Sequence, residues 1–154
     1  LEAFETACAD AGSKLKMVSL SHVGNLDGVA IPVKEAAKIA KDHGAMVCID
    51  GAQSTPHMKV DVQDLGIDFM AFSIHKMMGP SGMGGLWGRM ELLEIMRSIT
   101  SGGSTVNTSH YDSLTWSKPP ARFECELGNY AGILGTSSAI DYISQIDLYA
   151  VHEH

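Results

Sequence analysis

The stretch DGAQSTPHMKVDVQDLGIDFMAFSIHKMMGPSGMGGLWGR, residues 50–89, decides the fold of this chain. It contains a continuously apolar run at 69–72 (FMAF), which ends in the polar sequence Ser73-Ile74-His75-Lys76. A second apolar run, AMVCI at 45–49, comes directly before the stretch and ends at Asp50. Such runs are typical of strands that are covered on both faces, as in a parallel sheet.

Helical and extended patterns alternate outward from this stretch. Residues 2–11 have a helical pattern and residues 16–20 (KMVSL) a strand pattern. The segment PVKEAAKIAKDHG at 32–44 starts with Pro and stops with Gly, as helices commonly do. GGLWG at 84–88 predicts a short strand that turns back beside the strand at 69–72. We also expect helices at 91–99 and 129–146 and irregular structure at 101–128.

This alternation predicts an α/β fold with a mostly parallel sheet covered by helices. Ligands bind such sheets outside the carboxyl ends of the strands. Six polar side chains follow the ends of the three predicted parallel strands: Asn25, Asp50, Gln53, Ser73, His75 and Lys76. We therefore predict that the three strand ends converge on one crevice.

Composition narrows the class of protein. The chain has 154 residues, of which 45% are hydrophobic and 19% charged, and this is enough apolar material for a sizeable core. Its net charge of −7 would repel a phosphate backbone, so we expect no nucleic-acid partner. No apolar run reaches the roughly 18 residues that a bilayer crossing requires, so we expect no membrane association.

The cysteines and histidines exclude two further kinds of site. Cys8, Cys48 and Cys125 are odd in number and widely spaced, which suggests neither a disulfide framework nor a thiolate zinc site. The seven histidines form no helical His pair with a nearby carboxylate, so we expect no metal centre. A reducing, cytoplasmic location is the expectation that follows.

The six polar side chains have ordinary structural explanations when each is taken alone, but together they suit one cofactor. A lysine at a strand end among apolar neighbours is destabilised as an ammonium and becomes a nucleophile for an aldehyde. An aspartate one strand away can keep a heteroaromatic nitrogen protonated, so that a pyridoxal ring accepts electrons from a substrate. Hydroxyl, imidazole and glycine N–H groups suit a phosphate dianion.

Residues 50–89 resemble the centre of the class V aminotransferase family of pyridoxal-phosphate (PLP) enzymes, most closely its cysteine desulfurase and selenocysteine lyase branch. SHVGNLDG at 21–28, PPARFE at 119–124 and AIDYISQI at 139–146 extend the similarity thinly over nearly the whole chain. The resemblance implies the PLP-dependent transferase fold type I. Because enzymes of this family are several hundred residues long, residues 1–154 are expected to be the central part of the cofactor-binding large domain. The N-terminal segment and the C-terminal small domain are expected to be absent.

The resemblance also implies a role for most of the candidate residues. Lys76 would form a Schiff base with PLP and later move protons at the substrate α-carbon. Asp50 would pair with the pyridinium nitrogen, and Gln53 would bind the phenolic oxygen of the ring. Ser73 and His75 would hold the cofactor phosphate.

Four positions match or depart from the family pattern in ways that bear on the site. Asn25 matches a residue near the ring or the substrate carboxylate, and His22 is expected to be structural. Ile74 stands where the branch usually has Gly, which is tolerable if its side chain points into the core. Leu127 stands where desulfurases have a Thr that reaches the phosphate in the other subunit.

The implied activity is removal of sulfur or selenium from cysteine or selenocysteine. The implied partners are a second copy in a homodimer and a sulfur-acceptor protein. Two alternatives stay open: a class V aminotransferase, epimerase or lyase that acts on another amino acid, or an inactive truncated remnant. Leu127 favours the first of these.

Overall fold

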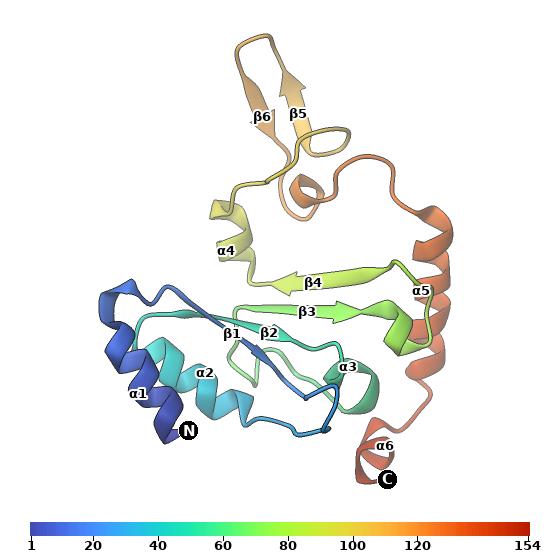
Figure 1. Cartoon of the computed structure of the whole chain (residues 1–154). Coiled ribbons are helices and arrows are strands. Elements are labelled where there is room, and N and C mark those ends of the chain that lie inside the picture. The colour runs from blue at the N-terminus through green and yellow to red at the C-terminus, as the bar shows by residue number, and fades with distance from the viewer.

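A four-stranded sheet forms the centre of the structure, which is a computed structural model that describes residues 1–154 (Figure 1). The strands follow the order β1-β2-β3-β4. Strands β1 (Met17–Ser21), β2 (Met46–Asp50) and β3 (Phe69–Ser73) are parallel, and β4 (Gly84–Gly88) runs antiparallel to β3. The predicted α/β fold with a mostly parallel sheet is therefore confirmed.

The register of the parallel strands decides where the site residues lie. Ser21 on β1 is opposite Asp50 on β2, and Asp50 is opposite Ala71 on β3. The carboxyl ends of all three strands thus lie at the same edge of the sheet.

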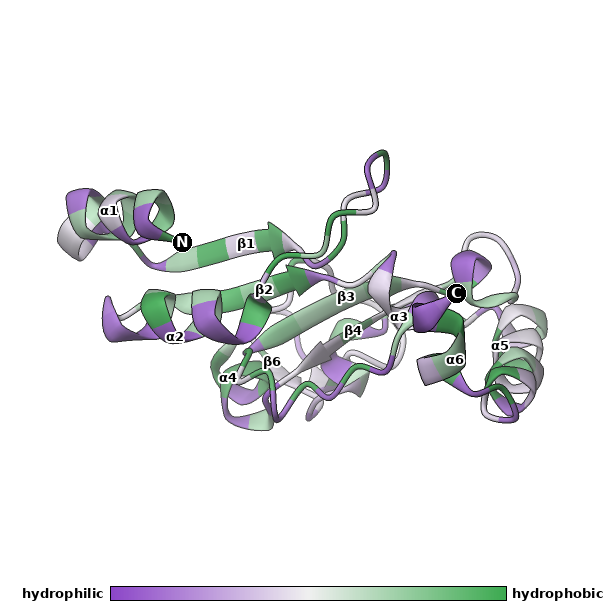
Figure 2. Cartoon of the chain, turned by 90° about the horizontal axis from the view of Figure 1, so that it is seen from below, coloured by the Kyte–Doolittle hydropathy of each residue, from purple (hydrophilic) through white to green (hydrophobic).

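Helices α1 (Glu2–Ala11) and α2 (Val33–Asp42) pack beside each other and cover one side of β1 and β2 (Figure 1). In Figure 2, hydrophilic and hydrophobic segments alternate along α2, as expected for a helix with one buried side. Its apolar side is made largely of alanine, with Ala40 fully buried. Small side chains let the helix approach the strands closely, and it meets the fully buried Val47 and Ile49 in the same core cluster.

The remaining helices are shorter or end earlier than the sequence pattern predicts. The helix expected at 91–99 ends at residue 95, and the one expected at 129–146 ends at residue 143. Asn129 begins the latter as its N-cap, because its side chain accepts a hydrogen bond from the N–H of Gly132 at 2.9 Å. Two further helices, α3 (Ser54–His57) and α6 (Leu148–Glu153), were not predicted. The two predicted helices are α4 (Met90–Ile95) and α5 (Tyr130–Ile143).

The expectation of irregular structure at 101–128 is wrong for the hairpin at 106–116. Strands β5 (Val106–Ser109) and β6 (Leu114–Trp116) form an antiparallel hairpin that projects away from the sheet (Figure 1). The hydroxyl groups of Thr108 and Thr115 lie 2.6 Å apart across the pair. Most hairpin side chains are exposed, so no apolar alternation marks these strands in the sequence.

The longest helix of the structure, α5, has 14 residues. None of the helices combines the length and the apolar character that crossing a bilayer would need.

Replacing a core side chain on β2 tests the fold. Ile49→Ala removes a fully buried side chain and leaves a cavity between β2 and its neighbours, so the free energy of unfolding should fall by about 2–5 kcal/mol. Urea unfolding followed by circular dichroism measures this. The same change at the fully exposed Ile99 should alter stability by less than about 0.5 kcal/mol. Equal effects at the two positions would contradict this core.

Candidate functional site

Three of the predicted site residues meet at one oxygen atom. The side-chain Oδ1 of Asn25 accepts a hydrogen bond from Nε2 of Gln53, and Nζ of Lys76 lies 3.5 Å from the same oxygen. Asn25 follows β1, Gln53 follows β2 and Lys76 follows β3. The structure thus brings together side chains that are up to 51 residues apart in the sequence.

A tight loop after β1 positions Asn25. The N–H of Gly24 donates to the carbonyl of Val29 at 2.9 Å, and the N–H of Gly28 donates to the carbonyl of Gly24 at 3.1 Å. Gly28 adopts a φ of 67°, a left-handed conformation that glycine accepts without strain. These bonds close the loop on itself and leave the Asn25 side chain free to face Gln53.

Asp50 ends β2 with its carboxylate exposed. Its Oδ1 accepts the N–H of Ala52 at 2.9 Å, and its carbonyl accepts the N–H of His22 at 2.9 Å. Gly51 follows at a close crossing with β3, where an added Cβ would lie 2.1 Å from the Cε of Met70. The carboxylate is therefore fixed by the backbone on one side and open on the other.

Lys76 lies on a short 3-10 helix, η2 (Ile74–Met77), directly after β3. Ile74 is 4% exposed and packs against Gly79, so its side chain points into the core, the condition under which replacement of the family's glycine is tolerable. Lys76 and Ser73 are half-buried, whereas His75 is exposed. The side chains of Ser73 and His75 make no hydrogen bond within the chain and are free to bind a ligand.

Two glycines of the segment GPSGMGG at 79–85 serve packing. A Cβ on Gly79 would lie 2.3 Å from Cγ2 of Ile74, and one on Gly85 would lie 2.5 Å from the ring of Phe72. These glycines let the backbone approach those two side chains.

The six candidates follow strands that end at one edge of the sheet, and two of them line the same cavity. Asn25 and Gln53 line a cavity of about 370 Å³ between the loop after β1, α3 and α6. The other four, Asp50, Ser73, His75 and Lys76, are not among its lining residues. The strand ends share an edge, and Lys76 Nζ reaches to within 3.5 Å of Asn25 Oδ1 at this cavity.

The sequence reasoning missed His57. Its Nδ1 lies 2.7 Å from the backbone carbonyl oxygen of Gln53, and its side chain lines the same cavity as Asn25 and Gln53. No pattern in the sequence marks this contact, because it joins a side chain to a backbone carbonyl.

His22 is buried, in accord with the structural role expected for it. It is 5% exposed, and its Nδ1 has no hydrogen-bond partner within the chain. Burial lowers the pKa of His22 below its ordinary value of 6.5. Burial also raises the pKa of the Cys48 thiol, which keeps this sulfur in its less nucleophilic, protonated form.

Comparison with known proteins identifies the class. The sequence profile of the family described as Aminotransferase class-V matches residues 3–154. The chain therefore belongs to this family of PLP-dependent enzymes.

Individual relatives narrow the likeness further. A protein named probable cysteine desulfurase, from Halalkalibacterium halodurans, is 47% identical over 142 residues, which cover 92% of this chain and 35% of that protein. The apo structure of a cysteine desulfurase from Thermococcus onnurineus matches with a TM-score of 0.88 and 38% identity, over 96% of this chain and 36% of that one. The chain thus spans about a third of the length of the relatives it matches.

A third match bears on the cofactor. The cystine C-S lyase C-DES, in a structure with glycine covalently linked to its PLP cofactor, matches with a TM-score of 0.84 and 25% identity. The match covers 98% of this chain and 41% of that one. Relatives and neighbours together imply PLP as the cofactor of this fold.

The burial of His22 predicts a pH dependence of stability. Because its pKa is lowered in the folded state, the unfolded chain binds more protons below about pH 6.5, and stability is lost as the pH falls through that range. The loss should not exceed about 1.4 kcal/mol per pH unit. Urea unfolding of wild type and His22→Gln between about pH 8 and pH 5 should show a weaker pH dependence in the variant.

A matched control uses a histidine on the hairpin. His110 is exposed, so His110→Gln should keep the pH dependence of the wild type. If His22→Gln and His110→Gln behave alike, buried His22 is not the source of the pH dependence.

Proposed function

We propose that this chain is part of a PLP-dependent enzyme that removes sulfur from cysteine, with Lys76 as its catalytic residue. The observation that carries the proposal is the meeting of Lys76, Gln53 and Asn25 at one oxygen, at the strand edge where Asp50 also lies. The cysteine desulfurases among its relatives support the choice of substrate. Within the whole protein, residues 1–154 would form the central part of the cofactor-binding large domain.

The donor set at this edge fits PLP. The cofactor has an aldehyde, a basic ring nitrogen, a phenolic oxygen and a phosphate, which require an amine, a carboxylate, a hydrogen-bonding amide and a group of donors. Lys76 supplies the amine and Asp50 the carboxylate. Gln53 supplies the amide, and the unpartnered side chains of Ser73 and His75 supply donors for the phosphate.

Each residue has a distinct task in the reaction. PLP, when bound, supplies an electron sink for the bond that breaks at the substrate α-carbon. The Lys76 amine binds the cofactor and then takes and returns the proton at that carbon. The Asp50 carboxylate holds a proton on the ring nitrogen. Asn25 Oδ1, 3.5 Å from Nζ, orients the Lys76 amine.

A second candidate function keeps the cofactor and changes the substrate. Leu127 is 85% exposed and has no group that could donate a hydrogen bond to a phosphate. This departure favours another class V activity, an aminotransferase, epimerase or lyase on a different amino acid. Selenocysteine is also a substrate under the leading proposal, because its bond between selenium and the β-carbon corresponds to the carbon–sulfur bond of cysteine.

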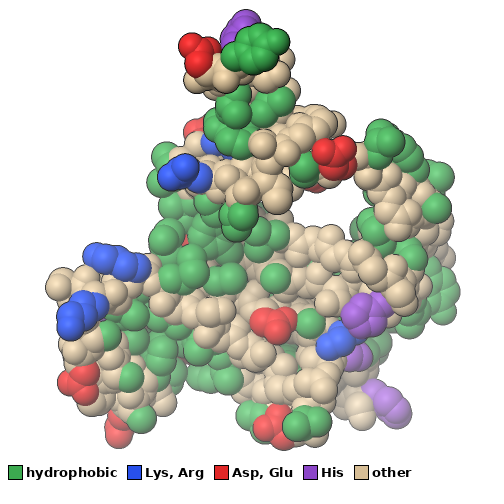
Figure 3. Space-filling view, turned by 45° about the horizontal axis from the view of Figure 1, so that its top comes forward, with side chains coloured by type: hydrophobic (Ala, Val, Ile, Leu, Met, Phe, Trp, Pro, Cys, Tyr) green, Lys and Arg blue, Asp and Glu red, His purple; other side chains and the backbone are tan.

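The proposed partners are a second copy of the chain and a sulfur-acceptor protein. Figure 3 shows hydrophobic side chains on the surface of the hairpin and α5. On α5, Tyr130 and Leu134 are 65% and 71% exposed, a degree of exposure typical of surfaces that associate. We also keep the cytoplasm as the proposed location, on the grounds of the three free cysteines.

Replacing Lys76 tests the proposal. The wild-type chain should change the visible absorption of added PLP, and borohydride reduction should join the cofactor covalently to the peptide that contains Lys76. Lys76→Ala should abolish both signals, because it removes the amine that lies 3.5 Å from Asn25 Oδ1. Absorption spectra and peptide mass spectrometry measure this.

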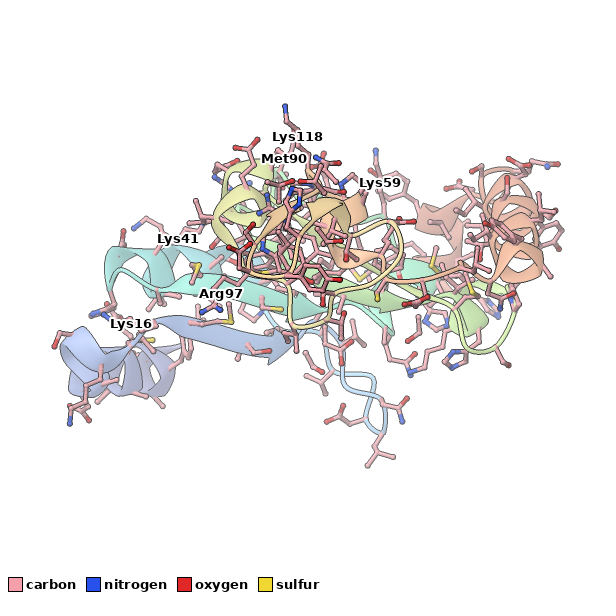
Figure 4. The ribbon with its side chains drawn as sticks, turned by 90° about the horizontal axis from the view of Figure 1, so that it is seen from above. Lys16, Lys41, Lys59, Met90, Arg97 and Lys118 are labelled. Atoms are coloured by element: carbon pink, nitrogen blue, oxygen red, sulfur yellow. The ribbon has the colours of Figure 1, made fainter.

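The control is a lysine that points into solvent. Figure 4 shows Lys118 extending away from the body of the molecule, so Lys118→Ala should keep the absorption change and the labelled peptide. Labelling that survives in Lys76→Ala, or that is spread over exposed lysines such as Lys118, would refute the assignment of Lys76.

Replacing Asp50 tests its proposed contact with the ring nitrogen of PLP. Asp50→Asn keeps the shape of the side chain but removes its charge, so the Kd for PLP should rise about 10- to 100-fold, the worth of one charge-assisted hydrogen bond. Fluorescence or absorption titration measures the Kd. Asp10→Asn, at an exposed position on α1, should leave it unchanged. Equal Kd values for the two variants would remove Asp50 from the site.

A further inference from the structure

His57 makes a side-chain contact that the roles given so far do not explain. Its Nδ1 lies 2.7 Å from the backbone carbonyl oxygen of Gln53, four residues earlier. A carbonyl oxygen only accepts hydrogen bonds, so Nδ1 carries the proton and donates it. The contact therefore fixes the tautomer of a neutral His57 ring, with Nε2 left as the acceptor.

This hydrogen bond stabilises a helix that is too short to be stable by itself. Helix α3 has four residues, and Pro56 within it has no N–H to donate. A single helical turn gains too few hydrogen bonds to offset the cost of ordering its backbone. The His57 side chain adds one bond, and it does so at Gln53, the N-cap residue directly before the helix.

The Gln53 side chain is not used in capping this helix. N-cap side chains commonly accept a hydrogen bond from the first turn, but Gln53 makes no such bond. Its carboxamide instead donates to Asn25 Oδ1, the oxygen that also lies 3.5 Å from Lys76 Nζ. The direction of this carboxamide depends on how the backbone of Gln53 is held.

We propose that His57 is a positioning residue, whose Nδ1–H holds the Gln53 carbonyl and thereby directs the Gln53 carboxamide to Asn25 and, through Asn25, to Lys76. The inference rests on the proposed cofactor-binding role of Gln53, Asn25 and Lys76. His57 itself is exposed, so it contributes little to core packing. A change at His57 can reach the cluster through this hydrogen bond or through the cavity that its side chain lines beside Asn25 and Gln53.

Three substitutions separate the hydrogen bond from the rest of the side chain. In His57→Asn the amide nitrogen occupies the position of Nδ1 and keeps the donor. In His57→Gln the donor moves one carbon further out, and in His57→Ala it is lost. The Kd for PLP should rise about 3- to 10-fold in the Gln and Ala variants and stay within about twofold of wild type in the Asn variant.

A second measurement needs no cofactor. The side-chain amide protons of Gln53 should exchange with water several-fold faster in His57→Gln and His57→Ala than in wild type, because the bond to Asn25 opens more often. His57→Asn should exchange like wild type. Nuclear magnetic resonance of the nitrogen-15-labelled chain measures these rates, and His110→Asn on the hairpin serves as the matched control.

Each outcome decides the proposal. Recovery in His57→Asn alone supports it, whereas equal exchange rates in all three variants overturn it. If His57→Ala does not fold, the comparison of the Asn and Gln variants decides in its place. If wild type does not bind PLP, the proposed function fails, but the exchange rates still test whether His57 positions Gln53.

Discussion

The parallel, in-register pairing of β1, β2 and β3 is the constraint on which the site depends. Because Ser21, Asp50 and Ala71 lie at one level across the sheet, each strand delivers its following loop to the same edge. Asn25, Gln53 and Lys76 come from those three following segments, and they meet only because the strands end together. A shift of one residue in this register would turn every strand side chain to the opposite face and separate the cluster.

A buried carboxylate holds this register at the other end of the strands. Asp68, directly before β3, accepts the backbone N–H of Val47 at 2.8 Å and lies 3.0 Å from Nζ of Lys41. Its side chain is only 8% exposed, so the bond to β2 is buried, whereas the ion pair to α2 is partly exposed on its Lys41 side. The Asp68 side chain thereby joins the start of β3 to β2 and to the covering helix α2. Because this end of the strands is fixed, the positions of their opposite ends at the functional edge are fixed as well.

The sequence predicted the strands whose positions depend on apolar patterning. It missed the features that depend on exposed side chains or on local hydrogen bonds. The strands that became β2 and β3 were predicted to within one residue, because their sides are covered and their residues continuously apolar. The β5–β6 hairpin was missed, since exposed strands of Ser and Thr carry no such pattern. The contact between Asn25 and Lys76 was predictable because the parallel strands end at the same edge of the sheet. The role of His57 was not predictable, because it depends on a hydrogen bond from its side chain to a backbone carbonyl, which no residue pattern marks.

The exposure of the cluster connects the proposed chemistry with the proposed association. Asn25, Asp50 and His75 are exposed, although electrostatic control of a reaction is strongest where water is excluded. Something must therefore cover this edge before the Lys76 amine and the Asp50 carboxylate can act at full strength. The apolar side chains of α5, which packs beside η2, lie next to that edge and would be buried by the same contact. The proposed association and the proposed catalysis would thus both depend on one uncovered surface.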